Sequence, residues 1–320
     1  MAPPDRATGP SRGIVSLGEC MVELARGSDG RYGLSYGGDT FNTAVYLARC
    51  GVDTAYATLL GDDPYSGGIL ALAREEGIAV DLIRQRPGRT AGLYLIETSP
   101  TGERSFHYWR DRAPARELFD ATDDITGLVS DRMTRSAIVY LSGITLSLYP
   151  QTALDRLAAA LQTAREAGAQ IAMDGNFRPR GWGGDRNKAR TVFERFWRLT
   201  DIALPSVEDE GLLWGDDDWE AAARRLESFG VREIVIKCGT DPARCIGTGT
   251  TIEVPLPAVA TPVDTSAAGD SFNAAYLASR QEGADPGSAT LAGHRLAAVV
   301  VQHRGAVVPR AATDTVLKPA

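Results

Sequence analysis

The 320-residue chain lacks the features that direct a protein to a membrane or to nucleic acid. It has no run of about 20 apolar residues, which a membrane-spanning helix needs. Its 41 acidic residues outnumber its 34 basic ones, giving a net charge of −7. This balance argues against nucleic acid as the main partner, because such proteins need a basic face. No basic amphipathic segment indicates binding to a membrane surface.

Cysteine and histidine are also scarce. The four cysteines form no C-x-x-C pair, and with only three histidines no zinc-binding spacing can be built. Scattered free thiols fit a reducing compartment, so we expect packing cysteines in a cytoplasmic protein. Residues 1–12 are rich in proline, glycine and charge. They lack the apolar core of a signal peptide, and we expect a disordered tail there.

Two common nucleotide-binding signatures are missing. The chain contains no G-x-x-x-x-G-K-[ST] loop, and no G-x-G-x-x-G follows its first predicted strand. Instead, the small residues Ser266–Gly269 precede Asp270 and an alanine-rich helical stretch. Small residues before a helix leave backbone N–H groups open to an anion. The segment therefore predicts either a phosphate cradle beside a carboxylate or a helix start that needs small residues for packing.

Strands alternate with helices along most of the chain. Strand-like apolar runs are expected at residues 13–19, 54–60, 137–141, 170–174, 202–204 and 233–237. Helical patterns are expected at 39–50, from Pro64 to Gly77, and at 152–167, 268–281 and 286–303. This order predicts an α/β fold with a mostly parallel sheet covered on both faces.

Two segments break the alternation. Residues 90–97 and 104–110 read as a hairpin around a Ser-Pro-Thr-Gly turn, and residues 20–37 also leave the pattern. We expect both, as segments 20–37 and 90–110, to be excursions from the sheet edge. No linker divides the rest, so residues 13–320 are expected to form one domain.

Motifs spread over residues 14–310 resemble those of the ribokinase-like, or PfkB, sugar kinases. Asp264–Asp270 resembles the family's D-T-x-G-A-G-D signature, with Ala267 at the first glycine, as in the form found in 2-keto-3-deoxygluconate kinases. The other matches, in order, are Gly18–Leu24, Gly37–Thr43, Gly92–Tyr94, Gly102–Arg104, Tyr108–Arg110, Leu141–Ile144, Asp174–Arg180 and Leu213–Gly215. Several separated matches in one order are more specific than any single motif.

This resemblance implies a three-layer α/β/α fold with a small β-sheet lid. It implies a kinase that uses ATP and Mg²⁺ to phosphorylate the terminal hydroxyl of 2-dehydro-3-deoxy-D-gluconate. Arg110 and Arg178 match the family's substrate arginines, and an arginine fork suits a carboxylate. Tyr94 and Tyr108 match its substrate tyrosines. Taken singly, Arg110 could be a solvated strand arginine, and Tyr94 could be a buried hairpin residue.

The remaining substrate and catalytic roles follow from the same resemblance. Gly38, Asp39 and Asn42 would contact sugar hydroxyls, although Asp39 could equally be a helix N-cap. Asp270 would take the hydroxyl proton, and the amides of Ala267, Ala268 and Gly269 would hold the developing charge. A helix N-terminus favours an ionised carboxylate, so Asp270 is expected to be charged but weakly basic. A loose transition state with late proton transfer would ease this conflict.

The nucleotide contacts that the resemblance implies are Asn176, Ser206, Lys237, Gly239 and His294, together with the Ala267–Gly269 amides. Lys237 could instead be a solvated strand-end lysine, and His294 a packed helix histidine. Ser206 stands where many relatives have asparagine, and Asp209 where they have the glutamate of N-x-x-E. Asp209 could hold Mg²⁺ through water, but an acidic run is more often a solvated helix start.

Two other functions fit parts of the pattern. A fructokinase-type enzyme of the same family would bind a neutral sugar, which gives no reason for two arginines at the acceptor. A non-catalytic sugar-acid sensor on the same fold would not need Asp270. Exposed strands in the lid also suggest pairing with a second copy of the chain, an expectation that rests on fold-level analogy.

Overall fold

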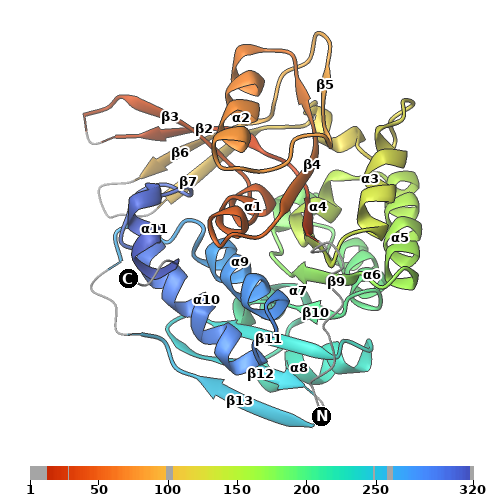
Figure 1. Ribbon diagram of the computed structural model, residues 1–320, viewed down its shortest axis with the longest axis vertical. Coiled ribbons are helices and arrows are strands. Elements are labelled where there is room, and N and C mark those ends of the chain that lie inside the picture. The colour runs from red at the N-terminus through yellow and green to blue at the C-terminus, as the bar shows by residue number, and fades with distance from the viewer. Residues whose placement is uncertain (1–12, 28, 99–103, 248, 258–261, 318–320) are drawn as a thin grey trace, which may run out of the picture.

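A computed structural model describes residues 13–27, 29–98, 104–247, 249–257 and 262–317. The expected disordered tail, residues 1–12, lies outside the described residues. The main sheet has nine strands in the order β13-β12-β11-β10-β9-β8-β1-β4-β5 (Figure 1). Their bounds are β1 Ile14–Leu17, β4 Thr54–Gly61, β5 Ile83–Arg86, β8 Ile138–Ser142, β9 Gln170–Asp174, β10 Ile202–Ala203, β11 Glu233–Cys238, β12 Asp241–Gly247 and β13 Thr250–Val254. The seven strands β11-β10-β9-β8-β1-β4-β5 pair in parallel, and β12 and β13 extend one edge in antiparallel pairing.

Helices cover both faces of this sheet, as expected. Because side chains alternate along a strand, the neighbours Ile14 and Val15 of β1 enter different cores. Val15 packs with α3 Ile125–Thr134, α5 Gln151–Glu166, α6 Arg186–Trp197 and α8 Trp219–Ser228. Ile14 packs with α1 Asp39–Arg49, α9 Ala268–Gln281 and α10 Pro286–Val300. The remaining helices are α2 Pro64–Glu75, α4 Gly143–Leu148, α7 Val207–Trp214 and α11 Arg310–Leu317, with 3₁₀ turns at Pro114–Glu117 and Pro179–Trp182.

A second, four-stranded sheet stands beside the first (Figure 1). Its strands, in the order β3-β2-β6-β7, are β3 Tyr32–Gly37, β2 Met21–Arg26, β6 Leu93–Thr98 and β7 Arg104–Trp109. It therefore comes from the two segments that break the alternation. The antiparallel pairing of β6 with β7 confirms the hairpin strands, while the predicted turn at 99–102 lies outside the described residues.

Local signals account for the helices that the sequence predicts. Asp63 caps α2 by accepting from the N–H groups of Tyr65 and Ser66, and Pro64 occupies the first helical position. Gly51 and Gly77 follow α1 and α2 with φ values of 84° and 80°, as helix-ending glycines do. α9 matches its predicted range, and α10 ends at Val300, three residues early. No helix in the described part of the chain has the length and apolarity needed to cross a bilayer.

Candidate active site

The candidate site lies where the parallel strands of the main sheet end. Asp174 is the last residue of β9 and Lys237 lies near the end of β11, while Asp39 and Asp270 lie in the first turns of α1 and α9. The carboxyl ends of parallel strands meet at one edge of a sheet, where α/β folds bind their ligands. Residues from four separated segments thus meet in one place.

Asp270 is buried at the start of α9. Its Oδ2 accepts from Asn42 Nδ2 at 2.8 Å, which joins α9 to α1. Burial raises the pKa of Asp270 well above its ordinary value of 3.8, and the nearby carboxylates of Asp39 and Asp174 raise it further. This direction is opposite to the effect expected of the helix N-terminus, because desolvation outweighs the helix dipole. A carboxylate with a raised pKa is a better proton acceptor.

The predicted anion cradle forms a left-handed turn into α9. Ala267 is the N-cap residue, with φ 57° and ψ 16°. The Ala268 N–H already donates to Thr265 O at 3.3 Å, a long bond that an anion could share as a three-centre bond. The amides of Ala267 and Gly269 are therefore the ones we expect to meet an anion most directly.

Lys237 lies in the site, so the solvated alternative is wrong. Only 15% of its side chain is exposed, and its Nζ donates to Asp174 Oδ2 at 2.9 Å and to Asn273 Oδ1 at 3.1 Å. A Cβ on Gly269 would lie 3.6 Å from this Nζ, so the ammonium is next to the cradle. Asn273 also donates to Asp174 Oδ2 at 2.7 Å and to Tyr140 OH at 3.0 Å. The lysine is thus held in a buried polar network.

The predicted sugar-binding turn lies beside the start of α9, because Asn42 of α1 bonds Asp270. Gly38 is the N-cap of α1 and Asp39 its first helical residue, so the N-cap alternative for Asp39 is wrong. A Cβ on Gly38 would lie 2.0 Å from Glu19 O, so only glycine fits there. Asp39 Oδ2 accepts from Asn176 Nδ2 at 2.8 Å. This contact places Asn176, expected at the nucleotide, beside the predicted acceptor residues. Burial raises the pKa of Asp39, and the carboxylate of Asp174 adds to the shift.

Both predicted tyrosines and Arg110 lie on or directly after the strands of the small sheet. The rings of Tyr94 and Tyr108 stack with centroids 5.9 Å apart, and Tyr94 OH donates to the buried carboxylate of Glu23. Arg110 lies over the Tyr108 ring at 5.9 Å and donates to Glu19. Burial raises the pKa of Tyr108, and the charges of Arg110, Arg178 and Arg180 oppose the shift, so all three guanidinium groups lie near this phenol.

Arg178 is bonded in a different way from Arg110. Its Nη1 donates to Asp209 Oδ1 and to Phe177 O, both at 2.7 Å, and 55% of its side chain is exposed. The neighbouring Arg180 donates to Phe106 O at 2.7 Å, which ties the loop after β9 to the small sheet. The two predicted substrate arginines therefore approach Tyr108 from opposite sheets, each already paired with a carboxylate.

The other predicted nucleotide residues lie around α7 and α10. Ser206 Oγ caps α7 by accepting from Asp209 N at 3.2 Å. Gly239 has φ 61°, and a Cβ there would lie 3.0 Å from Glu208 Oε1. The His294 ring packs edge-on against Phe272, with centroids 5.1 Å apart, and its Nε2 is buried without a partner among the described residues. Burial lowers its pKa, which favours the neutral form of the imidazole.

The part of the chain that the structure describes offers no ready-made metal centre. Within the described ranges, no group of three or more His, Cys, Asp or Glu side chains is arranged to hold a metal ion. Asp209, the predicted magnesium residue, accepts a hydrogen bond from Arg178.

All four cysteines are free, in agreement with the packing role expected of them.

Comparison with known proteins identifies the family of this site. The family model described as "pfkB family carbohydrate kinase" matches residues 11–313. The chain belongs to this family. It is 38% identical to the 2-dehydro-3-deoxygluconokinase of Dickeya dadantii, over 93% of this chain and 97% of that protein. It is also 38% identical to the 2-dehydro-3-deoxygluconokinase of Escherichia coli K12, over 94% and 99%.

A solved structure shows the same fold. The protein provisionally called ribokinase II from E. coli, in complex with ATP and Mg²⁺, superposes with a TM-score of 0.83. The superposition covers 97% of this chain and 100% of that one, at 22% sequence identity. The ribokinase-like α/β fold expected from the sequence is confirmed.

Several polar residues of this kinase's site were not predicted as site residues. Glu19, Glu23, Asp174 and Asn273 are all buried, and each bonds a predicted site residue. Three of them lie inside motifs that carry the resemblance, and Asn273 lies three residues after the Asp270 signature. The sequence signal that could have identified Asp174 is its position as a polar residue at the end of an apolar strand.

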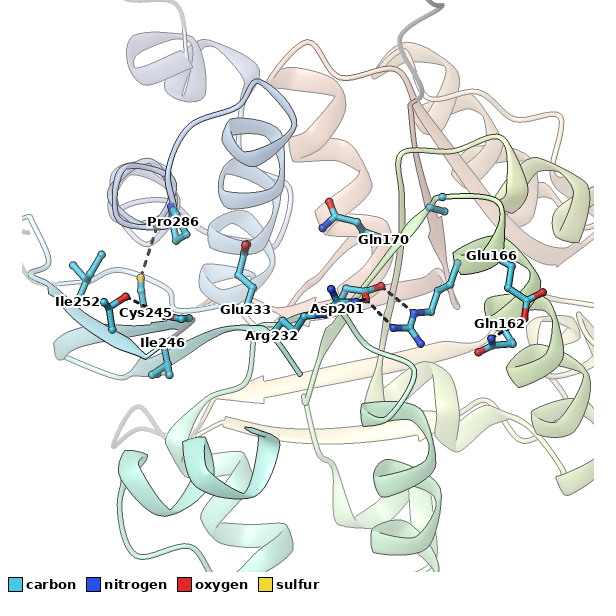
Figure 2. Close-up of a pocket in the computed structure, with 15 residues that line it drawn as sticks. Gln162, Glu166, Gln170, Asp201, Arg232, Glu233, Cys245, Ile246, Ile252 and Pro286 are labelled. Atoms are coloured by element: carbon cyan, nitrogen blue, oxygen red, sulfur yellow. Dashed lines mark hydrogen bonds and ion pairs between the residues drawn. The ribbon is translucent and has the colours of Figure 1, made fainter. Parts of the chain in front are cut away.

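A large cavity lies elsewhere in the kinase. It has a volume of about 790 Å³ and lies at the amino ends of β9, β10 and β11, opposite the site (Figure 2). Two of its lining carboxylates are already paired: Asp201 accepts from Arg165, which also lines the cavity, at 2.9 and 3.2 Å, and Glu233 accepts from Arg280 outside it at 2.6 and 2.8 Å. The cavity contains none of the predicted site residues.

Proposed function

We propose that this kinase transfers the γ-phosphoryl group of ATP to the terminal (C6) hydroxyl of 2-dehydro-3-deoxy-D-gluconate. The observation that carries the proposal is the 38% identity, over nearly the whole chain, to two bacterial kinases named for this substrate. The arginines and tyrosines beside Asp39 and Asp270 suit a small sugar acid, because a guanidinium fork matches a carboxylate.

In this proposal Asp270 is the general base. Its carboxylate lies between Asn42, which orients it, and the cradle at the start of α9. The raised pKa makes Asp270 a stronger proton acceptor than an exposed aspartate, so proton transfer from the hydroxyl need not wait until bond formation is complete. The cradle amides and the Lys237 ammonium stabilise negative charge on the transferred group.

The acceptor is held by groups on both sheets. Asp39 and Asn42 bind hydroxyl groups at the Gly38 turn, Tyr94 and Tyr108 form the wall of the small sheet, and Arg110 and Arg178 bind the carboxylate. For this, each arginine must bind the substrate carboxylate while it keeps its bond to a carboxylate of the protein. A guanidinium has five N–H donors, so one partner leaves donors for another.

ATP and Mg²⁺ complete the proposed reaction. Ser206, Gly239 and His294 belong to the nucleotide side of the site, and Asn176 bridges the two sides through Asp39. Mg²⁺ usually keeps several waters and is bound by substrate phosphates plus one or two carboxylates. The donor set near the cradle, Asp174 and Asp209, fits such a loosely held ion better than a dedicated metal cage. Bound Mg²⁺ would neutralise charge on the phosphates.

A turnover assay with ATP and a panel of keto-sugar acids and neutral hexoses tests the proposal. We expect turnover of 2-dehydro-3-deoxy-D-gluconate, and the Asp270→Asn variant should lose about 10²- to 10⁴-fold in kcat, the usual contribution of a general base. Unchanged turnover in Asp270→Asn would contradict the base assignment. ATP-independent binding of the acid without turnover would favour the sensor.

Arg110→Met separates the acid kinase from a fructokinase-type enzyme. The variant leaves the substrate carboxylate without a charged partner, and such hydrogen bonds contribute about 1.5–3 kcal/mol. We expect kcat/KM for the sugar acid to fall by roughly 10- to 150-fold, with a much smaller change for fructose. Equal losses on both substrates would show that Arg110 does not read the carboxylate.

We further propose that the small sheet is a lid and that its outer face joins two copies of the chain. The face that carries Glu23, Tyr94 and Tyr108 turns toward the site. By the alternation of side chains, Leu34 and Trp109 lie on the opposite face, and they are 51% and 59% exposed. Exposed large apolar side chains on one sheet face suit an interface.

A further inference from the structure

Glu19 forms a buried ion pair with the predicted substrate residue Arg110. Glu19 follows β1 and Gly18, and 1% of its side chain is exposed. Arg110 follows β7 of the small sheet, with 18% exposed. Its Nη2 donates to Glu19 Oε2. The pair therefore links the main sheet to the small sheet at the acceptor side of the site.

The pair is incomplete on both sides. Glu19 Oε1 and Arg110 Nε are both buried without a hydrogen-bond partner among the described residues. A guanidinium and a carboxylate can form two parallel bonds, but here only one is made. An unmade bond on a buried polar atom is costly, so a second acceptor would stabilise Arg110. Because 18% of the Arg110 side chain is exposed, its remaining N–H groups can meet an incoming anion. A substrate carboxylate supplies such an acceptor.

Glu19 is fixed more firmly than an ordinary ion-pair partner. A Cβ on Gly92 would lie 2.7 Å from its Oε1, and a Cβ on Gly38 would lie 2.0 Å from its backbone oxygen. Two glycines of the site thus enclose Glu19. Arg110 is in turn held between Glu19 and the ring of Tyr108, 5.9 Å from the ring centroid. Glu19 is the anchor of this stack.

We infer that Glu19 is a positioning residue, which holds the Arg110 guanidinium in the orientation that binds the carboxylate of the sugar acid; the inference rests on the proposed function. Glu19 does not touch the substrate carboxylate, since two carboxylates repel. It spares the substrate the entropy cost of ordering a long side chain. It should therefore affect substrate binding more than the chemical step.

The test measures steady-state kinetics for Glu19→Gln, Glu19→Ala, Arg110→Met and the double variant Glu19→Ala/Arg110→Met. We expect Glu19→Ala to raise KM for the sugar acid about tenfold or more, with kcat within about twofold and KM for ATP unchanged. Glutamine keeps an acceptor for Nη2, so Glu19→Gln should fall between the wild type and alanine. The double variant should resemble Arg110→Met alone, because Glu19 acts through Arg110.

A matched control comes from another buried pair. Glu76 accepts from Arg49 at 2.7 and 3.0 Å, away from the site residues described above. Glu76→Ala should lower the unfolding temperature without raising KM for the acid. If it raises KM as much as Glu19→Ala does, the effect of Glu19 is general destabilisation and the inference fails.

Two further outcomes are decisive and can be told apart. If the wild type turns over the acid but the effects of Glu19→Ala and Arg110→Met simply add, Glu19 does not act through Arg110, and only this inference is overturned. If the wild type turns over neutral sugars and not the acid, the proposed function and this inference both fall.

Discussion

Burial decides the chemistry of single residues in this site. Residue types alone suggested an ionised Asp270, because a helix N-terminus stabilises negative charge by about 1 kcal/mol or less. The structure buries that carboxylate beside Asp39 and Asp174, and the pKa rises instead. Lys237 shows the same limit of sequence reasoning. A lysine at a strand end looks solvated until β9 and α9 are known to place Asp174 and Asn273 around it.

The raised pKa of Asp270 predicts a stability cost that depends on pH. The folded protein holds the proton more tightly than the unfolded chain, so the unfolding free energy falls as pH rises above the unfolded pKa, which is about 4. Asp270→Asn cannot ionise, and its amide oxygen can still accept from Asn42. We expect the variant to match the wild type in unfolding temperature near pH 4 and to exceed it by ~2 °C or more at pH 8. Thermal unfolding of both proteins across this range checks the prediction, and a difference that does not vary with pH would contradict it.

At the scale of elements, strong local patterns were predictable and edge elements were not. α9 and β9 match their predicted ranges because apolar spacing and flanking signals agree. Strands β5, β12 and β13 were missed. β13 has four exposed residues out of five, and β12 begins with Asp-Pro, so neither shows the alternation of a half-buried strand. Pairing with a formed neighbour, which only the tertiary structure supplies, makes them strands.

The turn into α9 offers a prediction with a built-in control. Ala267 has φ 57°, a left-handed conformation that costs a non-glycine residue about 1–2 kcal/mol. Ala267→Gly should relieve this strain and raise the unfolding free energy by ~0.5–1 kcal/mol after the entropy cost of glycine. Ala268 lies in the helix, so Ala268→Gly should lower it by a similar amount, ~0.5–1 kcal/mol. Chemical denaturation of both variants gives the sign, and equal effects would show that the Ala267 turn is not strained.

The whole molecule places the site between two sheets, and its C-terminal segment fixes the far end of α1. The C-terminal segment lies against α1 and the end of α2 (Figure 1). Tyr46 OH of α1 donates to Ala306 O at 2.6 Å, and Arg310 of α11 donates to Oε2 of Glu76, the residue after α2, at 2.6 Å. These contacts lie at the far end of α1 from Asp39 and Asn42, whose own partners are Asn176 and Asp270. In front, Arg180 bonds the small sheet. A lid that closes over the sugar would exclude water and so direct phosphoryl transfer to the hydroxyl.

The proposed dimer is tested at the outer face of the small sheet. Leu34 on β3 is 51% exposed, and a charge there would be buried without a partner in a dimer but solvated in a monomer. We expect the wild type to have the mass of a dimer in light scattering coupled to size exclusion, and Leu34→Glu to shift it to a monomer with an unchanged unfolding temperature. Leu128→Glu is the control, because Leu128 is 41% exposed on α3, which belongs to the main sheet's layer of helices. A monomeric wild type, or a Leu34→Glu variant that stays dimeric, would remove this face from the assembly.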